Sequence, residues 1–251
     1  MNKVRADQLL VDLQLCESRS LAQRLIMAGE VRLGSDELVR KPGQMLPEDC
    51  NIFLNDEPRY VSRGAFKLLA ALEKFQPDLA GGVALDLGAS TGGFTEVLLQ
   101  YGLSRVYAVD VGYGQLHRKL RQDPRVILLE RTNARDLTPA LIPEPISVLT
   151  ADVSFISLTK VLGPCAPLLQ PEAWIFALVK PQFESERHEV GAGGVVRDDT
   201  VRQRCIEKVQ RFALTELGWS LAGVVPSPIK GPKGNQEYIA AFRNRKAGHN
   251  E

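Results

Sequence analysis

The sequence predicts an α/β fold in which a doubly wound, mostly parallel sheet follows a small N-terminal α+β domain. Strand-like and helical stretches alternate between residues 83 and 242, which is typical of parallel sheets with helical crossovers. A glycine-rich turn follows the first of these strands, and the residues before position 55 carry a separate pattern of helices and strands. The length of 251 residues accommodates one large and one small domain.

The N-terminal domain is expected to begin with two short helices. Apolar residues at offsets 0, 3, 4 and 7 predict the first helix over residues 6–13. The second starts near Ser18 or Ser20, either of which suits an N-cap, and stops at Gly29. Three strand-like runs follow, at residues 31–33, 38–41 and 51–54. We therefore predict a small domain over residues 1–54.

The larger domain is predicted to span residues 62–251, after a linker at residues 55–61 that is polar and contains a proline. Its first helix starts at Ser62 and carries an apolar stripe, which places Arg63 and Lys67 together on the opposite face. Strands are predicted at residues 83–87, 105–110, 126–130, 146–151, 174–179, 220–225 and 238–242. In such a sheet, ligands bind beyond the carboxyl ends of the strands.

The composition excludes several classes of protein. Hydrophobic residues make up 44% and charged residues 24%, so the chain is globular rather than disordered or fibrous. Its longest apolar runs are too short to span a membrane and its N-terminus is polar, which favours a cytoplasmic protein. The four cysteines are widely separated, so neither a disulfide framework nor a metal site is expected. The net charge is only +1, and nucleic-acid binding would require basic residues sorted onto one face.

The glycine-rich turn over residues 86–94 closes a strand and opens a helix, so its backbone N–H groups can approach a ligand closely. Asp86 precedes the turn and would repel a pyrophosphate, but it suits a ligand with a cationic amino-acid end. Asp110 closes the next strand, 22 residues after Gly88, where a carboxylate accepts ribose hydroxyls. Together these features indicate S-adenosylmethionine, with Asn133 near its adenine. The predicted cofactor-binding residues are Asp86, Gly88, Ser90, Thr91, Gly92, Gly93, Phe94, Asp110, Val111, Asn133, Ala134 and Asp152.

A competing interpretation treats Ser90 as a nucleophile. Residues 88–92 match the G-x-S-x-G turn of α/β-hydrolases, and Asp and His residues follow in the required order. That fold needs further sheet strands and an oxyanion loop before the turn, whereas this turn follows the first strand of the large domain. A glycine turn without any ligand is the remaining alternative.

Ionisable residues stand at three more strand ends, namely Asp152, Lys180 and Glu237. Lys180 ends an apolar run and is costly to bury unless it is paired, and Asp152 at the preceding strand end is its natural partner. Lys67, on the polar face of the opening helix, would complete the cluster. Taken alone, Lys67 and Glu237 read as solvated surface residues, and only the combination favours a site.

The whole pattern resembles the TlyA family, rRNA ribose 2'-O-methyltransferases related to FtsJ that are often labelled hemolysins. The resemblance covers nearly the whole chain and rests on residues 61–68, 86–94, 109–116, 130–135 and 180–184, with an N-terminal part like an S4 RNA-binding domain. It implies a Rossmann-like, doubly wound methyltransferase sheet and an S-adenosylmethionine cofactor. The family's Lys-Asp-Lys-Glu tetrad matches Lys67, Asp152, Lys180 and Glu237, which are the predicted catalytic residues.

The resemblance also implies a substrate, cytidine 2'-hydroxyls in ribosomal RNA or ribosomal subunits. Longer family members have an additional C-terminal helix, which we do not expect in this chain. The short form is associated with 23S rRNA, with 16S rRNA as a further target. A ribose hydroxyl is a poor nucleophile, so it needs a base or a cation beside its oxygen as the proton leaves. We expect Lys180 to be the central group, with the other tetrad residues arranging it and the hydroxyl.

RNA contacts are predicted from basic and aromatic residues. Arg19 stands in the first turn of a helix, where the helix dipole disfavours a cation by about 0.3 to 1 kcal/mol, so an outside anion would offset that cost. Two aromatic residues near strand ends are candidates for stacking on the target base, with core packing as the alternative. The predicted RNA-binding residues are Arg5, Arg19, Arg24, Arg63, Arg131, Arg135, Tyr113 and Phe155. Residues 184–198 are glycine-rich and are expected to form a mobile loop that orders on substrate.

Three other functions fit the sequence less well. Base methylation would need an Asp/Asn-Pro-Pro-Tyr/Phe element, which is missing, and the Pro164-Cys165 pair lies within a predicted helix, as a structural cysteine would. A non-catalytic RNA-binding assembly factor would need the ligand site but not the tetrad. A pore-forming protein would need an amphipathic or apolar membrane segment, and the sequence shows none.

Overall fold

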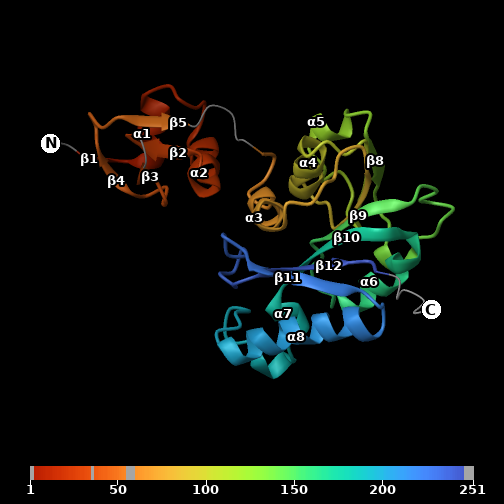
Figure 1. Cartoon of the computed structure of the whole chain (residues 1–251). Coiled ribbons are helices and arrows are strands. Elements are labelled where there is room, and N and C mark those ends of the chain that lie inside the picture. The colour runs from red at the N-terminus through yellow and green to blue at the C-terminus, as the bar shows by residue number, and fades with distance from the viewer. Residues whose placement is uncertain (1–2, 35–36, 55–59, 246–251) are drawn as a thin grey trace, which may run out of the picture. The chain divides into compact units, whose positions relative to one another are not determined.

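The computed structural model describes residues 3–34, 37–54 and 60–245, and the chain divides into two compact units, Met1–Arg59 and Tyr60–Glu251 (Figure 1). Residues 55–59 of the predicted linker and the end of the chain after residue 245 lie outside the described part. Tyr60 and Val61, which the sequence assigned to the linker, belong to the second unit. Tyr60 is buried there, and the Val61 N–H donates to a Glu96 carboxylate oxygen at 2.6 Å.

The first unit combines two helices with short antiparallel strands. Its elements are β1 (Lys3–Arg5), α1 (Ala6–Asp12), α2 (Arg19–Ala28), β2 (Val31–Leu33), β3 (Glu37–Leu38), β4 (Met45–Pro47) and β5 (Ile52–Leu54). Strand β1 pairs with β4, and β2 lies between β3 and β5. Ser18 is the N-cap of α2, accepting the Leu21 N–H, and Gly29 ends the helix in the left-handed conformation. Apolar residues from both helices and from the strands form one small core.

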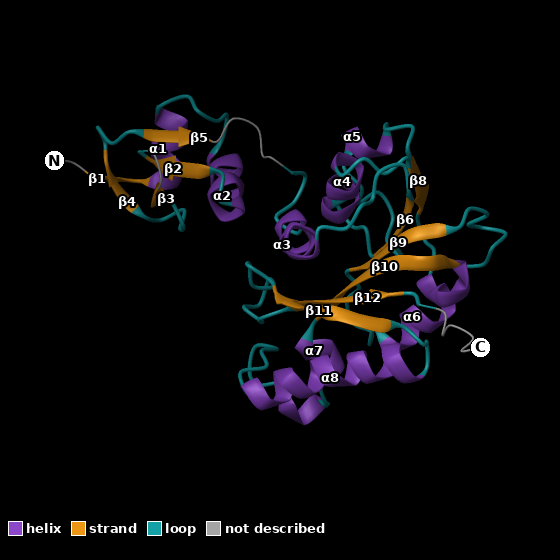
Figure 2. Ribbon diagram, viewed as in Figure 1, coloured by secondary structure: helices purple, strands orange, loops and turns teal. Residues whose placement is uncertain are grey.

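The second unit contains a seven-stranded sheet with helices on both faces (Figure 2). Its strands are β6 (Val83–Leu87), β7 (Arg105–Val109), β8 (Val126–Leu129), β9 (Ile146–Ala151), β10 (Leu169–Val179), β11 (Ser220–Pro226) and β12 (Tyr238–Arg243). Strands β8, β7, β6, β9 and β10 run parallel in that order, followed by β12 and β11, each antiparallel to its neighbour. The predicted mostly parallel α/β sheet is confirmed.

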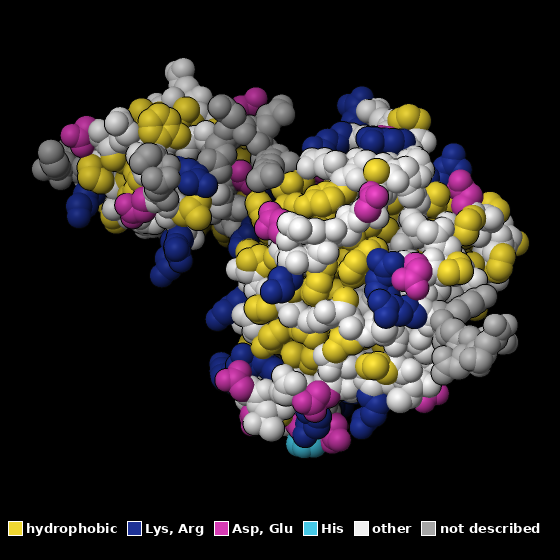
Figure 3. All heavy atoms as spheres, viewed as in Figure 1, with side chains coloured by type: hydrophobic (Ala, Val, Ile, Leu, Met, Phe, Trp, Pro, Cys, Tyr) yellow, Lys and Arg dark blue, Asp and Glu magenta, His cyan; other side chains and the backbone are white. Residues whose placement is uncertain are grey.

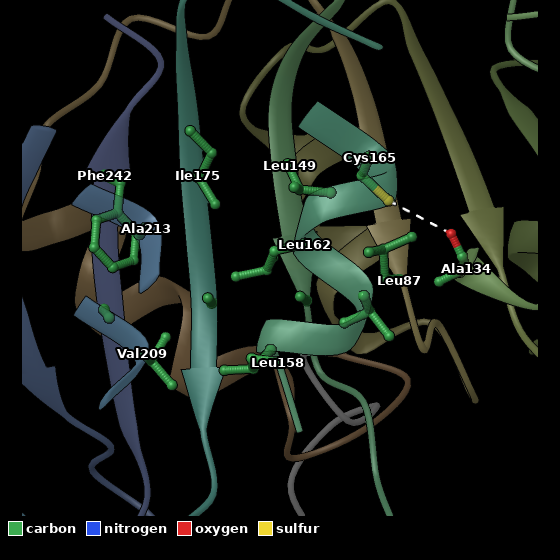
Figure 4. Close-up of a cluster of buried hydrophobic side chains, with 14 of the residues drawn as sticks. Leu87, Ala134, Leu149, Leu158, Leu162, Cys165, Ile175, Val209, Ala213 and Phe242 are labelled. Carbon is green, nitrogen blue, oxygen red and sulfur yellow. Dashed lines mark hydrogen bonds between the residues drawn. The ribbon is translucent and has the colours of Figure 1, made fainter. Parts of the chain in front are cut away.

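Two hydrophobic cores hold helices against the two faces of this sheet. The helices are α3 (Ala65–Phe75), α4 (Gly93–Gln100), α5 (Arg118–Arg121), α6 (Thr159–Cys165), α7 (Pro181–Glu184) and α8 (Asp199–Thr215), with 3-10 turns η1 (Ala134–Asp136), η2 (Ala166–Leu168) and η3 (Arg187–Glu189). Helices α3, α4 and α5 contribute to one core and α6 and α8 to the other. Figure 4 shows the second core, where the Cys165 thiol donates to the Ala134 carbonyl.

Several predicted boundaries differ from the structure. Helix α3 starts at Ala65 rather than Ser62, because residues 62–64 form a turn. Strand β10 starts at Leu169 rather than Trp174, although its pairing with β9 shifts in register between these two residues, where Glu172 has a positive φ. Asp110 follows β7 instead of ending it. No helix in the described ranges combines the length and apolar character that a membrane span requires.

The topology brings the chemically interesting loops to one edge. Strand order reverses between β6 and β9, since the chain continues from β6 toward β8 on one side and from β9 toward β10 on the other. The carboxyl ends of these parallel strands lie along the same edge, and ligands in such sheets bind at this switch point. The glycine turn, Asp110, Asp152 and Lys180 all follow strands that end there.

Candidate active site

The four tetrad side chains line one cavity of about 460 Å³ at the carboxyl edge of the sheet. They come from distant parts of the chain: Lys67 from α3, Asp152 and Lys180 from the residues after β9 and β10, and Glu237 from the residue before β12. Because β12 runs antiparallel to β10, its start meets the end of β10 at this edge. The tertiary structure therefore assembles the predicted constellation.

The first ion pair joins Lys67 Nζ to Glu237 Oε2 at 2.6 Å. Both groups are buried, with 8% of Lys67 and 1% of Glu237 exposed. Lys67 lies in the predicted cluster and not on a solvated helix face, because Glu237, 170 positions later in the chain, packs against that face of α3. Gln182 Nε2 donates to the other Glu237 oxygen at 3.4 Å, so both carboxylate oxygens have a partner.

The second ion pair joins Lys180 Nζ to Asp152 Oδ1 at 2.6 Å, which is the pairing expected from the neighbouring strand ends. Lys180 is 8% exposed and also donates to the Ser154 hydroxyl at 2.9 Å. Two acceptors thus hold its amine in a fixed position at the cavity. Burying a charge requires a partner of this kind, and the two buried lysines, Lys67 and Lys180, are each compensated by a carboxylate.

The glycine turn between β6 and α4 is packed against the same site. A Cβ placed on Gly88, whose φ is +79°, would lie 2.6 Å from the Asp152 carbonyl oxygen. At Gly92, with φ of +98°, it would lie 2.2 Å from the Leu120 side chain. Glycine is therefore required at both positions. A second cavity of about 110 Å³ lies along the turn and is lined by Ser62, Gly64, Gly88, Ala89, Ser90, Thr91, Gly93, Phe94 and Asp152.

Asp110 connects the glycine turn to the end of β7 through hydrogen bonds. Its two carboxylate oxygens accept the N–H groups of Ser90 at 2.8 Å and Gly112 at 2.7 Å. Asn133 is engaged locally, because its side-chain oxygen accepts from the backbone and side chain of Arg135. Asp110, Val111, Asn133 and Ala134 line neither of the two cavities described above.

Asp86, which is predicted to contact a cationic ligand, lines neither of the two cavities described above. It is fully buried, and its oxygens accept the hydroxyls of Thr95 at 2.6 Å and Thr150 at 2.8 Å. Burial raises the pKa of this carboxyl to about 6, against the opposing effect of the two threonines. Asp86 therefore joins β6 to β9 and α4 beneath the turn.

Arg5 and Arg19 have an internal partner instead of the outside anion inferred for Arg19. Both donate to Asp7, which is fully buried, and Gln23 donates to the same carboxylate. The hydrogen bond from Arg5 is the main reason that the pKa of Asp7 lies well below its usual range. About half of each arginine side chain remains exposed, so both guanidinium groups reach the surface.

The other RNA-binding candidates are exposed, and two of them are aromatic. The Arg131 guanidinium lies 4.4 Å from the centre of the Tyr113 ring. Phe155 is 90% exposed with φ of +65°, lies 5.0 Å from the Phe183 ring, and lines the tetrad cavity. A phenylalanine held in this backbone region at a cavity mouth is strained and is typical of a functional residue. Arg24, Arg63 and Arg135 are also exposed.

Positive charge on the second unit does not form one continuous face in the view of Figure 3. Lys and Arg side chains there are interspersed with Asp and Glu, and several basic side chains gather over α5. Arg121 of α5 pairs with Glu130, and Lys119 pairs with Glu96. Two of the basic residues of α5 are therefore paired with carboxylates.

The tetrad cavity is also lined by residues that sequence reasoning did not single out, among them Ser154, Gln182, Phe183, Lys233 and Asn235. Ser154, Gln182 and Phe183 directly follow Asp152 and Lys180 at strand ends, and this position was an available signal. No local pattern marks the other two. The loop predicted at residues 184–198 contains η3 and a bridge between Gly191 and Val195, and its mobility stays a prediction.

The competing chemistries gain no support. The Ser90 hydroxyl hydrogen-bonds Gln115 at 3.2 Å rather than a histidine. Cys165 is buried in α6, and desolvation raises the pKa of its thiol to about 12, so it is an unreactive structural cysteine.

Comparisons with known proteins match both units. Residues 60–244 match the FtsJ-like methyltransferase family and residues 4–48 match the S4 domain. A Mycobacterium tuberculosis protein named 16S/23S rRNA (cytidine-2'-O)-methyltransferase TlyA is 48% identical over 97% of this chain and 91% of its own length. The Campylobacter jejuni 23S rRNA (cytidine-2'-O)-methyltransferase TlyA is 37% identical over 81% of this chain and 80% of its own. A Streptococcus thermophilus structure described as a hemolysin covers 98% of this chain and 90% of its own, with 41% identity and a TM-score of 0.75.

Proposed function

This chain belongs to the TlyA family of FtsJ-like methyltransferases that carry an S4 domain, and we propose that it transfers a methyl group to a ribose 2'-oxygen of ribosomal RNA. The observation that carries the proposal is the assembly of two buried lysine–carboxylate pairs around one cavity beside the glycine turn. An RNA-binding factor without catalysis would have no need to bury four charges there.

The turn fits S-adenosylmethionine. Gly88, Gly92 and Gly93 let the backbone approach a ligand, and the N-terminus of α4 suits the carboxylate of its methionine part. Each Asp110 oxygen accepts one N–H and retains a lone pair for a ribose hydroxyl. The proposed cofactor contacts are Gly88, Ser90, Thr91, Gly92, Gly93, Phe94, Asp110, Val111, Asn133, Ala134 and Asp152. When bound, the cofactor supplies a methyl group on a positively charged sulfur.

The tetrad prepares the 2'-hydroxyl. We assign the central role to Lys180, whose amine is held by Asp152 and Ser154 and is positioned to stabilise the ribose oxygen as its proton leaves. Lys67 and Glu237 form the second pair in the same cavity and orient the nucleotide. Phe155 at the mouth offers an exposed ring on which a base can stack. Holding the reacting groups together supplies much of the rate enhancement.

The proposed substrate is a cytidine in 23S rRNA, which is the target shared by the names of the two relatives above. The S4 domain would hold the RNA through arginines such as Arg5, Arg19 and Arg24. Arg63, Arg131 and Arg135 of the second unit would add phosphate contacts, with Tyr113 beside Arg131. A ribosomal substrate would make the enzyme cytoplasmic.

The test is transfer of labelled methyl from S-adenosylmethionine to purified 50S and 30S subunits from a strain that lacks the enzyme. Lys180→Met removes the central amine, and Lys74→Met, on the exposed side of α3, is the matched control. We expect label on a ribose 2'-oxygen of 50S RNA, retained by the control and reduced at least about 100-fold in Lys180→Met. Label on 30S alone would overturn the 23S assignment. Tight subunit binding without transfer to either subunit would establish an assembly factor instead.

A further inference from the structure

Lys233 is a third lysine at the tetrad cavity, and the reaction described above does not use it. It lies in the loop between β11 and β12 and lines the cavity together with its neighbour Pro232. The same loop carries Glu237 of the tetrad, so Lys233 stands on the wall that also positions a catalytic residue. Its ammonium group therefore belongs to the surroundings of the substrate.

The side chain of Lys233 lies along a second loop, the one that contains Gly194. A Cβ placed on Gly194 would lie 3.2 Å from Lys233 Cδ and 3.3 Å from its Nζ, so the lysine stem covers this glycine closely. Asn235, only 1% exposed, joins the two loops by donating to the Gly194 carbonyl at 2.8 Å and accepting the Val196 N–H at 2.9 Å. The lysine is thus supported by a wall of two connected loops.

The charges that line the cavity leave Lys233 without a counterion. Lys67 is neutralised by Glu237 and Lys180 by Asp152, each at 2.6 Å. Lys233 forms no ion pair with any carboxylate of residues 3–34, 37–54 or 60–245. The lining therefore carries one uncompensated positive charge, which favours an anionic part of the substrate.

The proposed complex offers two anions as candidates for this charge. The methionine carboxylate of the cofactor is expected along the glycine turn, whose small cavity Lys233 does not line. The other anion is the RNA phosphate on the 3' side of the target nucleotide, only a few bonds from the 2'-oxygen. We propose, resting on the function assigned above, that Lys233 binds this 3'-phosphate and so contributes to the affinity for the RNA.

The experiment measures methyl transfer to 50S subunits from the deficient strain by the full-length chain and by three variants. Lys233→Ala removes the cation, Lys233→Arg keeps it, and Lys230→Ala removes an exposed lysine of the same loop that lines neither cavity. We expect Lys233→Ala to raise the KM for subunits about tenfold, with kcat within about twofold of the unchanged chain. The slope of log KM against log salt should fall by about 1. Lys233→Arg and Lys230→Ala should stay close to the unchanged chain.

The outcomes separate this inference from the proposed function. If the unchanged chain transfers no methyl group, the function fails and the lysine is not at issue. If transfer occurs and Lys233→Ala behaves like Lys230→Ala, Lys233 binds no phosphate. A raised Kd for S-adenosylmethionine would assign the lysine to the cofactor, and a reduced kcat at unchanged KM would assign it to the chemical step. Either result overturns the inference.

Discussion

Replacing Asp86 by asparagine should make the second unit less sensitive to rising pH. Asp86 lies in β6 with both oxygens hydrogen-bonded to threonine hydroxyls and with no exposed surface. Asparagine has the same shape, and it can turn its oxygen to Thr95 and donate its amide to the Thr150 hydroxyl. The substitution therefore removes the ionisation of a buried group and leaves its packing in place.

The size of the effect follows from the pKa of Asp86, which burial raises from 3.8 to about 6. An acid with a raised pKa binds its proton more tightly in the folded chain than in the unfolded chain. The protonated carboxyl therefore adds its full contribution to the free energy of unfolding at pH values below the pKa of the unfolded chain. This contribution is lost as the pH rises through the pKa of the folded chain. The total loss is about 3 kcal/mol, of which about 1 to 2 kcal/mol falls between about pH 5 and about pH 8. Asp86→Asn does not suffer this loss.

The assay is urea unfolding followed by tryptophan fluorescence at several pH values. Both tryptophans, Trp174 and Trp219, lie in the second unit, so the signal reports that unit alone. We expect the free energy of unfolding of Asp86→Asn, relative to the unchanged chain, to rise by about 1 to 2 kcal/mol between about pH 5 and about pH 8. A difference that is the same at both ends of this range would show that the folded carboxyl ionises as it does in water. A Kd for S-adenosylmethionine that rises more than about tenfold would show that Asp86 holds the ligand after all.

Four other substitutions or measurements test the remaining geometry. Gly88→Ala should destabilise the second unit by about 2 to 4 kcal/mol, because the added Cβ meets the carbonyl oxygen of the residue after β9, and an unchanged urea midpoint would contradict that contact. Ser154→Ala should lower kcat about tenfold at unchanged KM for subunits, because Lys180 loses a hydrogen-bond acceptor, and an unchanged kcat would make the serine dispensable. Asp7→Asn should destabilise the first unit by about 1 to 3 kcal/mol, because two half-exposed arginines lose their buried ion-pair partner. Unfolding followed by circular dichroism measures this change, and an unchanged free energy of unfolding would mean that solvent replaces the two ion pairs. Cys165 should resist iodoacetamide in the folded chain at about pH 8, since the pKa of its thiol is raised to about 12, and mass spectrometry would reveal any native-state labelling.

Features that depend on local sequence were predictable. Alternating strands and helices identified the sheet, and the confirmed ends of α2 follow from capping at Ser18 and Gly29. The glycine turn was evident because its backbone conformation requires glycine within a few residues. The pairing of Asp152 with Lys180 also followed from the sequence, since parallel strands that neighbour each other end at the same edge.

Partners that come from distant segments were decided only by the tertiary structure. Lys67 lies on the polar face of its helix, which from the sequence alone resembles a solvated surface. The antiparallel strand β12 places Glu237 against that face. The position of Arg19 in the first turn of a helix predicted an external anion, but Asp7 of α1 is its ion-pair partner. Asp86 precedes the glycine turn as predicted, but its side chain is fully buried beneath the turn and accepts hydrogen bonds from two threonines. Sequence periodicity specifies which side of an element a residue occupies, whereas packing between elements determines what covers that side and therefore whether a charge is solvated, paired or buried.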